Sequence, residues 1–256
     1  MKRYRCTNFF IDCIRNYPVE SEIKSVITSR YGDLDIEQKI KRYLSFRPPS
    51  LRIITEYHNL LQEIEDSYIY GLYYSTVTSS CCLGERIFNI LILKLKNYYK
   101  ESECYKHIYA KESFDNWDKS IKMLWDWKVI TSEDAMIKYK KLTAIRHGFI
   151  HFSKLEDIEQ KALETLRIIY DITTYFFAIG YRQDIYFWCS GEIYIKKEAE
   201  QIPFVREMIL PHCLLAGYKH KIETVNNGFV MRDESTYDEK EISDEEFVKL
   251  RTTVKI

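Results

Sequence analysis

The stretch TAIRHGFIHFSK, residues 143–154, places an arginine and two histidines in an otherwise apolar frame. On a helix, His147 and His151 would share one face, whereas Arg146 and His151 would lie about 140° apart. A histidine titrates near neutral pH and can transfer a proton, and an arginine can hold two oxygens of a phosphate at once. This combination suits phosphodiester chemistry, above all RNA cleavage, in which the 2′-OH is a built-in nucleophile and no metal is needed.

Other interpretations of the same stretch stay open. The arginine and histidines could be solvated, or could pair with carboxylates of a neighbouring helix, while the apolar residues around them pack in the core. A metal site built on His147 and His151 lacks the glutamate of the H-E-x-x-H motif, and spacing points to no third ligand. A cysteine nucleophile with a histidine base is also conceivable, but the sequence around none of the seven cysteines marks it as the nucleophile. We therefore expect no metal and no cofactor. Gly148 either loosens this turn or lets a backbone or a phosphate approach closely.

Long helices are expected to position this stretch. From Leu51 to about Lys100, apolar residues recur every three or four positions without a proline. Gly71 is expected to separate two helices, and the small residues of STVTSSCCLG in the second helix let another backbone approach closely. A helix over about 114–125 follows, then one that starts near Thr131 or Ser132, and a last long helix ends at Gly180. Four or five helices joined by short links predict an up-and-down bundle.

Changes in the residue pattern along the sequence predict that the chain has three parts. Residues 1–50 are expected to form an N-terminal helical extension that ends at Pro48 and Pro49. Residues 51–180 are expected to form the helical bundle. Residues 181–256 are expected to form a small α+β appendage, because DIYFWCS and GEIYIKK alternate as strands do and KIETVNNGFVMRD contains an Asn-Gly turn. The predicted fold class is therefore mainly α.

Composition limits the kinds of partner and compartment. Thirty-eight basic and thirty-eight acidic side chains cancel to a formal net charge of zero, so a site for a polyanion must be a local basic patch. Seven cysteines without C-x-x-C spacing are expected to be reduced thiols in a cytosol. The start shows no signal-peptide pattern, and the longest apolar runs fall far short of the roughly 20 residues that span a bilayer. These features favour a cytoplasmic protein without a membrane anchor.

The motif RHGFIH resembles the R-x4-6-H signature of the HEPN superfamily. The stretch YIYGLYYSTVTSSCCLGERIFNILIL is similar to the first core region of that family, with small residues and a glutamate on a long central helix, and the resemblance covers about residues 51–180. It implies that Arg146 binds phosphate and stabilises the transition state, and that His151 is a general acid or base. His147 takes a position that more often holds Asn or Asp in the family; it could orient its neighbours, share the proton transfer or do neither.

The resemblance also implies a function. Catalytic members of the family are typically dimers whose two motifs form one composite, metal-independent ribonuclease site that leaves a 2′,3′-cyclic phosphate and a 5′-OH. An endoribonuclease, a homodimer and an RNA substrate are therefore expected. Many members act in toxin–antitoxin or antiphage defence systems, which implies an antitoxin or a regulatory protein as a further partner. Other members have lost activity, so the alternative is a catalytically inactive module that binds RNA, a nucleotide or a protein.

Two further sets of residues could support such a site. Glu85 lies within CCLGERIF, an apolar setting in which an unpaired charge would be costly, and is a candidate to pair with Arg146. Alternatively, Glu85 lies on a solvated face beside the arginine that follows it. Lys138, Lys140 and Lys141 precede Arg146 by up to two helical turns and could guide RNA phosphates toward it. They could equally form an ordinary solvated face.

Overall fold

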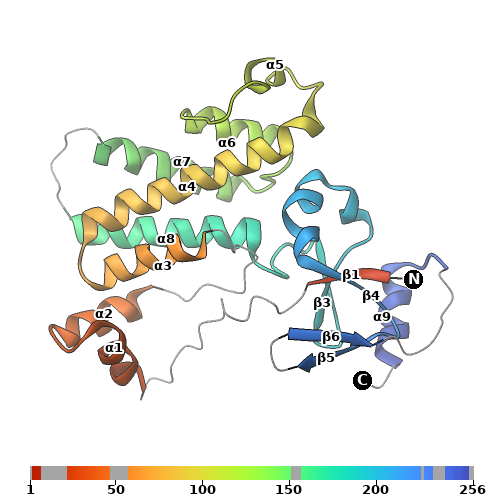
Figure 1. Ribbon diagram of the computed structural model, residues 1–256. Coiled ribbons are helices and arrows are strands. Elements are labelled where there is room, and N and C mark those ends of the chain that lie inside the picture. Colours follow the sequence, from red (N-terminus) through yellow and green to blue (C-terminus); the bar gives the residue numbers. More distant parts are fainter. Residues whose placement is uncertain are drawn as a thin grey trace. The chain divides into compact units, whose positions relative to one another are not determined.

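The computed structural model describes residues 2–6, 22–46, 57–150, 157–225, 228–232 and 240–253 (Figure 1). The chain divides into two compact units. The helical unit comprises the described residues from 22 to 176, and the sheet unit comprises residues 2–6 together with the described residues from 177 to 253. Each unit has its own buried core, and they are described separately below.

The helical unit is built from helices of 4 to 23 residues in a bundle-like arrangement (Figure 1). Its helices are α1 (Ile23–Tyr31), α2 (Ile36–Ser45), α3 (His58–Ile69), α4 (Tyr73–Leu95), α5 (Tyr105–Ile108), α6 (Trp117–Asp126), α7 (Glu133–Ile150) and α8 (Ile158–Phe177). A 3-10 turn, η3 (Lys96–Tyr99), directly follows α4. The prediction of a mainly α protein is thus confirmed.

Helix α4 is the central element of the helical unit, and it contacts α3, α6 and α7. Gly84 explains how the helices come so close, because a Cβ atom there would lie only 2.7 Å from Cδ2 of Leu142 on α7. The small-residue stretch therefore has the role that its composition predicted. Gly71, at φ 78, separates α3 from α4 in a conformation that suits glycine.

Residues Tyr73–Tyr99, which cover α4 and η3, are long and apolar enough to cross a membrane by length and composition. This is the one such helix in the part of the chain that the structure describes. Of its most apolar window, 56% is buried inside the protein, as expected for a helix at the centre of a helical bundle.

The first helices belong to the helical unit. Helix α1 contacts α2, and α2 contacts α3. Arg30 pairs with Asp66 on α3, and the ammonium of Lys39 donates to the backbone oxygen of Tyr31 at 2.6 Å. The structure therefore groups residues 22–46 with the bundle, whereas the sequence predicted a separate extension over residues 1–50. Pro48 and Pro49, the predicted boundary, lie outside the described residues.

The sheet unit contains a four-stranded antiparallel sheet in the order β2-β3-β1-β4 and a separate hairpin of β5 and β6. Their bounds are β1 (Lys2–Cys6), β2 (Tyr186–Cys189), β3 (Glu192–Ile195), β4 (Cys213–Gly217), β5 (Lys221–Val225) and β6 (Gly228–Arg232). Between β3 and β4 lie three short helical segments: the 3-10 helices η4 (Glu198–Gln201) and η6 (Leu210–His212) and the π-helix η5 (Val205–Ile209). Helix α9 (Asp244–Thr253) follows β6. The predicted strands around residues 186–195 and 221–232 are present. Strand β1 differs from the helical N-terminal extension that the sequence predicted, because it lies between β3 and β4.

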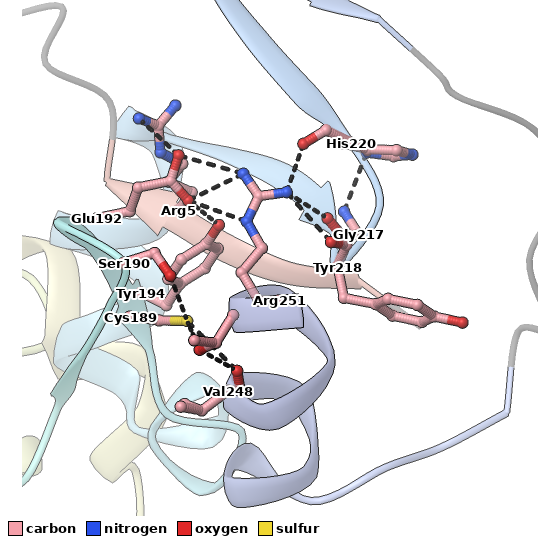
Figure 2. Close-up of polar contacts among 11 residues, drawn as sticks. Arg5, Cys189, Ser190, Glu192, Tyr194, Gly217, Tyr218, His220, Val248 and Arg251 are labelled. Atoms are coloured by element: carbon pink, nitrogen blue, oxygen red, sulfur yellow. Dashed lines mark hydrogen bonds and ion pairs between the residues drawn. The ribbon is translucent and has the colours of Figure 1, made fainter. Parts of the chain in front are cut away.

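Buried charges attach α9 to the sheet (Figure 2). Arg251 has a fully buried side chain, and its Nε and Nη2 donate to the carboxylate of Glu192 at 3.0–3.2 Å. Its Nη1 donates to the backbone oxygen of His220. Arg5 pairs with the same carboxylate at 3.2 Å, and the hydroxyl of Tyr194 donates to it. The ion pairs with Glu192 thus offset the cost of burying the charges of Arg251 and Arg5.

Candidate functional site

Arg146 lies near the end of α7, where three helices each contribute one side chain. Its Nη2 is 3.1 Å from Oε2 of Glu85 on α4. Its guanidinium carbon is 5.1 Å from the ring centroid of Trp117 on α6, within the range of a cation–π contact. The indole Nε1 of Trp117 donates to the same Oε2 of Glu85 at 3.2 Å. The pairing of Glu85 with Arg146 that the sequence suggested is therefore present.

These contacts orient the guanidinium without closing it off. The side chain of Arg146 is 30% exposed and that of Glu85 is 34% exposed, whereas Trp117 is buried. An arginine has five N–H donors, and the ion pair with Glu85 engages Nη2. The remaining donors can therefore bind an anion from solvent while Glu85 and Trp117 hold the side chain in place.

Cys81 lies one helical turn before Glu85 and within the electrostatic reach of Arg146. Burial raises the pKa of the Cys81 thiol to about 12; the charge of Arg146 acts in the opposite direction but is the weaker effect. The thiol is therefore protonated near neutral pH and is a poor nucleophile. The raised pKa therefore argues against Cys81 as a nucleophile at this site.

The rest of the predicted motif is only partly described. His147 is exposed, and Phe149 is buried with its ring centroid 6.1 Å from that of Tyr74. A Cβ atom at Gly148 would meet nothing within 4 Å, so this glycine is not needed for close helix packing. His151, the predicted general acid or base, lies outside the described residues.

The predicted RNA-binding lysines of α7 face acidic residues of α8. Lys138 pairs with Asp171 at 2.8 Å, and Lys141 pairs with Glu164. Lys140 is exposed. Two of the three lysines thus have their charge balanced within the protein, which favours the interpretation of an ordinary solvated face.

Trp117 is the residue that the sequence did not assign to the site. The sequence predicted only a helix over about residues 114–125 here, and Trp117 is a buried residue of that helix. The sequence did offer one indication, because the indole N–H of a buried tryptophan needs a hydrogen-bond acceptor. Residue spacing, however, does not identify that acceptor. Within the described ranges, no group of three or more His, Cys, Asp or Glu residues lies close enough to hold a metal ion.

An oriented, partly exposed guanidinium beside a histidine-containing segment can bind a phosphate and stabilise charge that develops on it. This chemistry follows from the positions of Glu85, Trp117 and Arg146. The chain matches no protein-family model, no curated protein and no solved structure.

Proposed function

We propose that this protein is a metal-independent endoribonuclease in which Arg146 binds the scissile phosphate and His151 transfers protons. The observation that carries the proposal is the arrangement of Arg146, whose guanidinium is held by Glu85 and Trp117 and is 30% exposed. A cation that is oriented before the substrate arrives stabilises the transition state without reorganising during the reaction. The resemblance of RHGFIH to the HEPN signature adds the histidine and the RNA substrate.

The proposed reaction needs no added water or metal. The 2′-oxygen of a ribose attacks the adjacent phosphorus, and the bond from phosphorus to the 5′-oxygen of the next nucleotide breaks. The 2′-OH proton goes to a general base and a general acid protonates the departing 5′-oxygen, so a 2′,3′-cyclic phosphate and a 5′-OH remain. In a homodimer, the two copies of His151 would supply one base and one acid, and Arg146 would neutralise the phosphate oxygens.

The biological setting is also part of this proposal. The resemblance to the HEPN family suggests a homodimer that acts in the cytoplasm as a toxin or an antiphage effector, with an antitoxin or regulatory protein as its partner. The zero net charge supports a target bound through a local site rather than through a general attraction to polyanions.

The test is cleavage of RNA by the purified full chain in excess EDTA. We expect fragments that end in a 2′,3′-cyclic phosphate, identified by mass spectrometry. Arg146→Ala and His151→Ala should each lower the cleavage rate at least about a hundredfold, since each removes a charge-stabilising or proton-transfer group. Asp134→Ala, an exposed change on the same helix, should leave the rate within about twofold.

Two results would contradict the proposal. One is cleavage that requires a divalent ion or that survives the loss of both Arg146 and His151. The other is a strict monomer at micromolar concentration during active cleavage, because the composite site needs two motifs. Melting temperatures of all variants separate loss of chemistry from loss of fold.

The second candidate is a catalytically inactive module that binds RNA, a nucleotide or a protein. The ion pairs of Lys138 and Lys141 favour it, because they leave α7 with less free positive charge to guide RNA toward Arg146. This candidate predicts saturable RNA binding while the RNA stays intact. Detection of the cyclic phosphate product rules it out.

A further inference from the structure

A pocket of about 730 Å³ lies in the helical unit between η3, α5 and α6. This volume falls within the range of roughly 300–1,000 Å³ that small-molecule sites occupy. Neither Glu85 nor Arg146 lines it, so it is separate from the site described above. Helix α6 contributes to both places, with Trp117 beside Arg146 and Met123 in the pocket wall.

The inner wall of the pocket is aromatic and apolar. Phe114, Met123 and Trp127 line it and are buried. The ring of Tyr99 stacks on that of Trp127, with the centroids 4.6 Å apart and the planes 4° from parallel. Within the described residues, the indole Nε1 of Trp127 is buried and has no hydrogen-bond partner. A buried N–H without a partner costs free energy, which an acceptor on a ligand would recover. Such a wall suits a flat ring that carries hydrogen-bond acceptors.

The rim of the pocket carries more unpaired positive charge than negative. Lys122 is already balanced by Asp126 at 3.1 Å. Lys106, Lys111 and Lys119 are exposed, and no carboxylate in the described part of the chain lies within ion-pair distance of them. Glu103 and Asp115 also line the rim and are the acidic groups that a bound anion would have to avoid. Three free ammonium groups against these two carboxylates favour a ligand with a compact negative group.

We propose that this pocket binds a free nucleotide, with its base against Trp127 and its phosphate at Lys106, Lys111 and Lys119. A nucleotide combines a flat ring, hydrogen-bond acceptors and a compact anion in one small molecule, which matches the wall and the rim together. The proposal does not depend on RNA cleavage at Arg146, so failure of either one leaves the other standing.

The first test is isothermal titration of the full chain with AMP, GMP, CMP and UMP at about 0.1 M salt. We expect saturable binding of at least one monophosphate at one site per chain. The matching nucleoside and inorganic phosphate should each bind at least about tenfold more weakly, which corresponds to about 1.4 kcal/mol, because each offers half of the recognised groups. Raising the salt to about 1 M should weaken the nucleotide further, because the rim lysines are exposed.

Variants then assign the binding to this pocket. Lys106→Ala combined with Lys119→Ala should lower the affinity at least about tenfold, whereas Lys140→Ala, outside the pocket, should not change it. Trp127→Phe keeps a ring but removes the indole N–H and should weaken binding several-fold. Its matched control is Trp125→Phe, since Trp125 does not line the pocket.

Three results would overturn the proposal. They are no binding of any monophosphate below millimolar concentration, equal affinity of the lysine variant and the wild type, and binding of a short RNA but of no free nucleotide. The lysine positions are exposed, so that variant is expected to fold even if Trp127→Phe does not.

Discussion

Replacing Glu85 by glutamine tests whether the carboxylate really holds Arg146 in place. The change keeps the size of the side chain and an oxygen that can accept from the indole N–H of Trp117, but it removes the negative charge. The ion pair with Nη2 of Arg146, now 3.1 Å long, would be lost. We expect the free energy of unfolding of the helical unit to fall.

The size of this effect follows from the exposure of the two partners. An ion pair in full contact with solvent contributes about 0–1 kcal/mol, and removing one partner of a fully buried pair costs about 3–5 kcal/mol. Glu85 and Arg146 are 34% and 30% exposed and lie between these limits. Because glutamine retains the hydrogen bond with Trp117, we expect a loss of about 1–2 kcal/mol, toward the lower limit.

A double-mutant cycle measures the pair directly. Urea unfolding of the wild type, Glu85→Gln, Arg146→Gln and the double variant gives a coupling energy, which we expect to be about 1 kcal/mol. Tryptophan fluorescence reports mainly on the helical unit, because Trp117, Trp125 and Trp127 are three of the four tryptophans.

The matched control is the pair of Lys122 and Asp126 on α6, whose side chains are 74% and 54% exposed. Its coupling energy should stay below about 0.5 kcal/mol. A coupling for Glu85 and Arg146 no larger than this control would refute the reasoning. So would a coupling that does not decrease in about 1 M salt, since the pair is partly open to solvent.

Four further substitutions test the packing and the buried polar groups of the two units. Gly84→Ala should destabilise the helical unit by about 1–3 kcal/mol, because a Cβ atom there would lie too close to Leu142. Gly148→Ala, where a Cβ atom would meet open space, should stabilise the unit by about 0.5–1 kcal/mol. Equal effects of the two substitutions in urea unfolding would contradict this reasoning. Arg251→Met should destabilise the sheet unit by about 3–5 kcal/mol, because it leaves the buried carboxylate of Glu192 without its ion-pair partner on α9. A loss of unfolding free energy below about 1 kcal/mol in thermal unfolding would show that this ion pair does not stabilise the unit. The pKa of Cys81 is raised from 9.0 to about 12, so its contribution to stability is complete below pH 9.0 and is lost as the pH rises toward about 12. The free energy of unfolding should therefore fall less over this range in Cys81→Ala than in the wild type; parallel pH profiles would contradict the raised pKa.

Local sequence patterns were sufficient to predict much of the helical unit. The glycine between α3 and α4 and the small residues on α4 have the roles that their types suggested. The predicted helix start near Ser132 is also present, since the Ser132 hydroxyl accepts from the backbone N–H of Ala135. These features depend on residues within a few positions of one another, where periodicity and capping act.

Strand β1 could not be predicted from local sequence patterns. Its residues, KRYRC, have partners in β3 and β4, for example Arg5 with Tyr194 and Lys2 with Gly217, far away in the sequence. Nothing within five residues specifies a strand at the centre of a sheet, because its hydrogen bonds and buried neighbours all come from the other end of the sequence. The same holds for Arg251, whose acceptor Glu192 lies on β3.

At the candidate site, too, some features could be predicted from the sequence and others depend on tertiary contacts. The sequence by itself determined the helical character of the chain and the residue types that could bind a phosphate. It made Glu85 a candidate partner for Arg146, because an apolar setting makes an unpaired carboxylate costly, but it left a solvated face as the alternative. Only the tertiary structure decided that Trp117 makes a cation–π contact with Arg146 and that Lys138 and Lys141 pair with carboxylates of α8. Helix periodicity specifies which face of a helix a side chain occupies, but its charge or ring partner is set by whichever helix packs against that face.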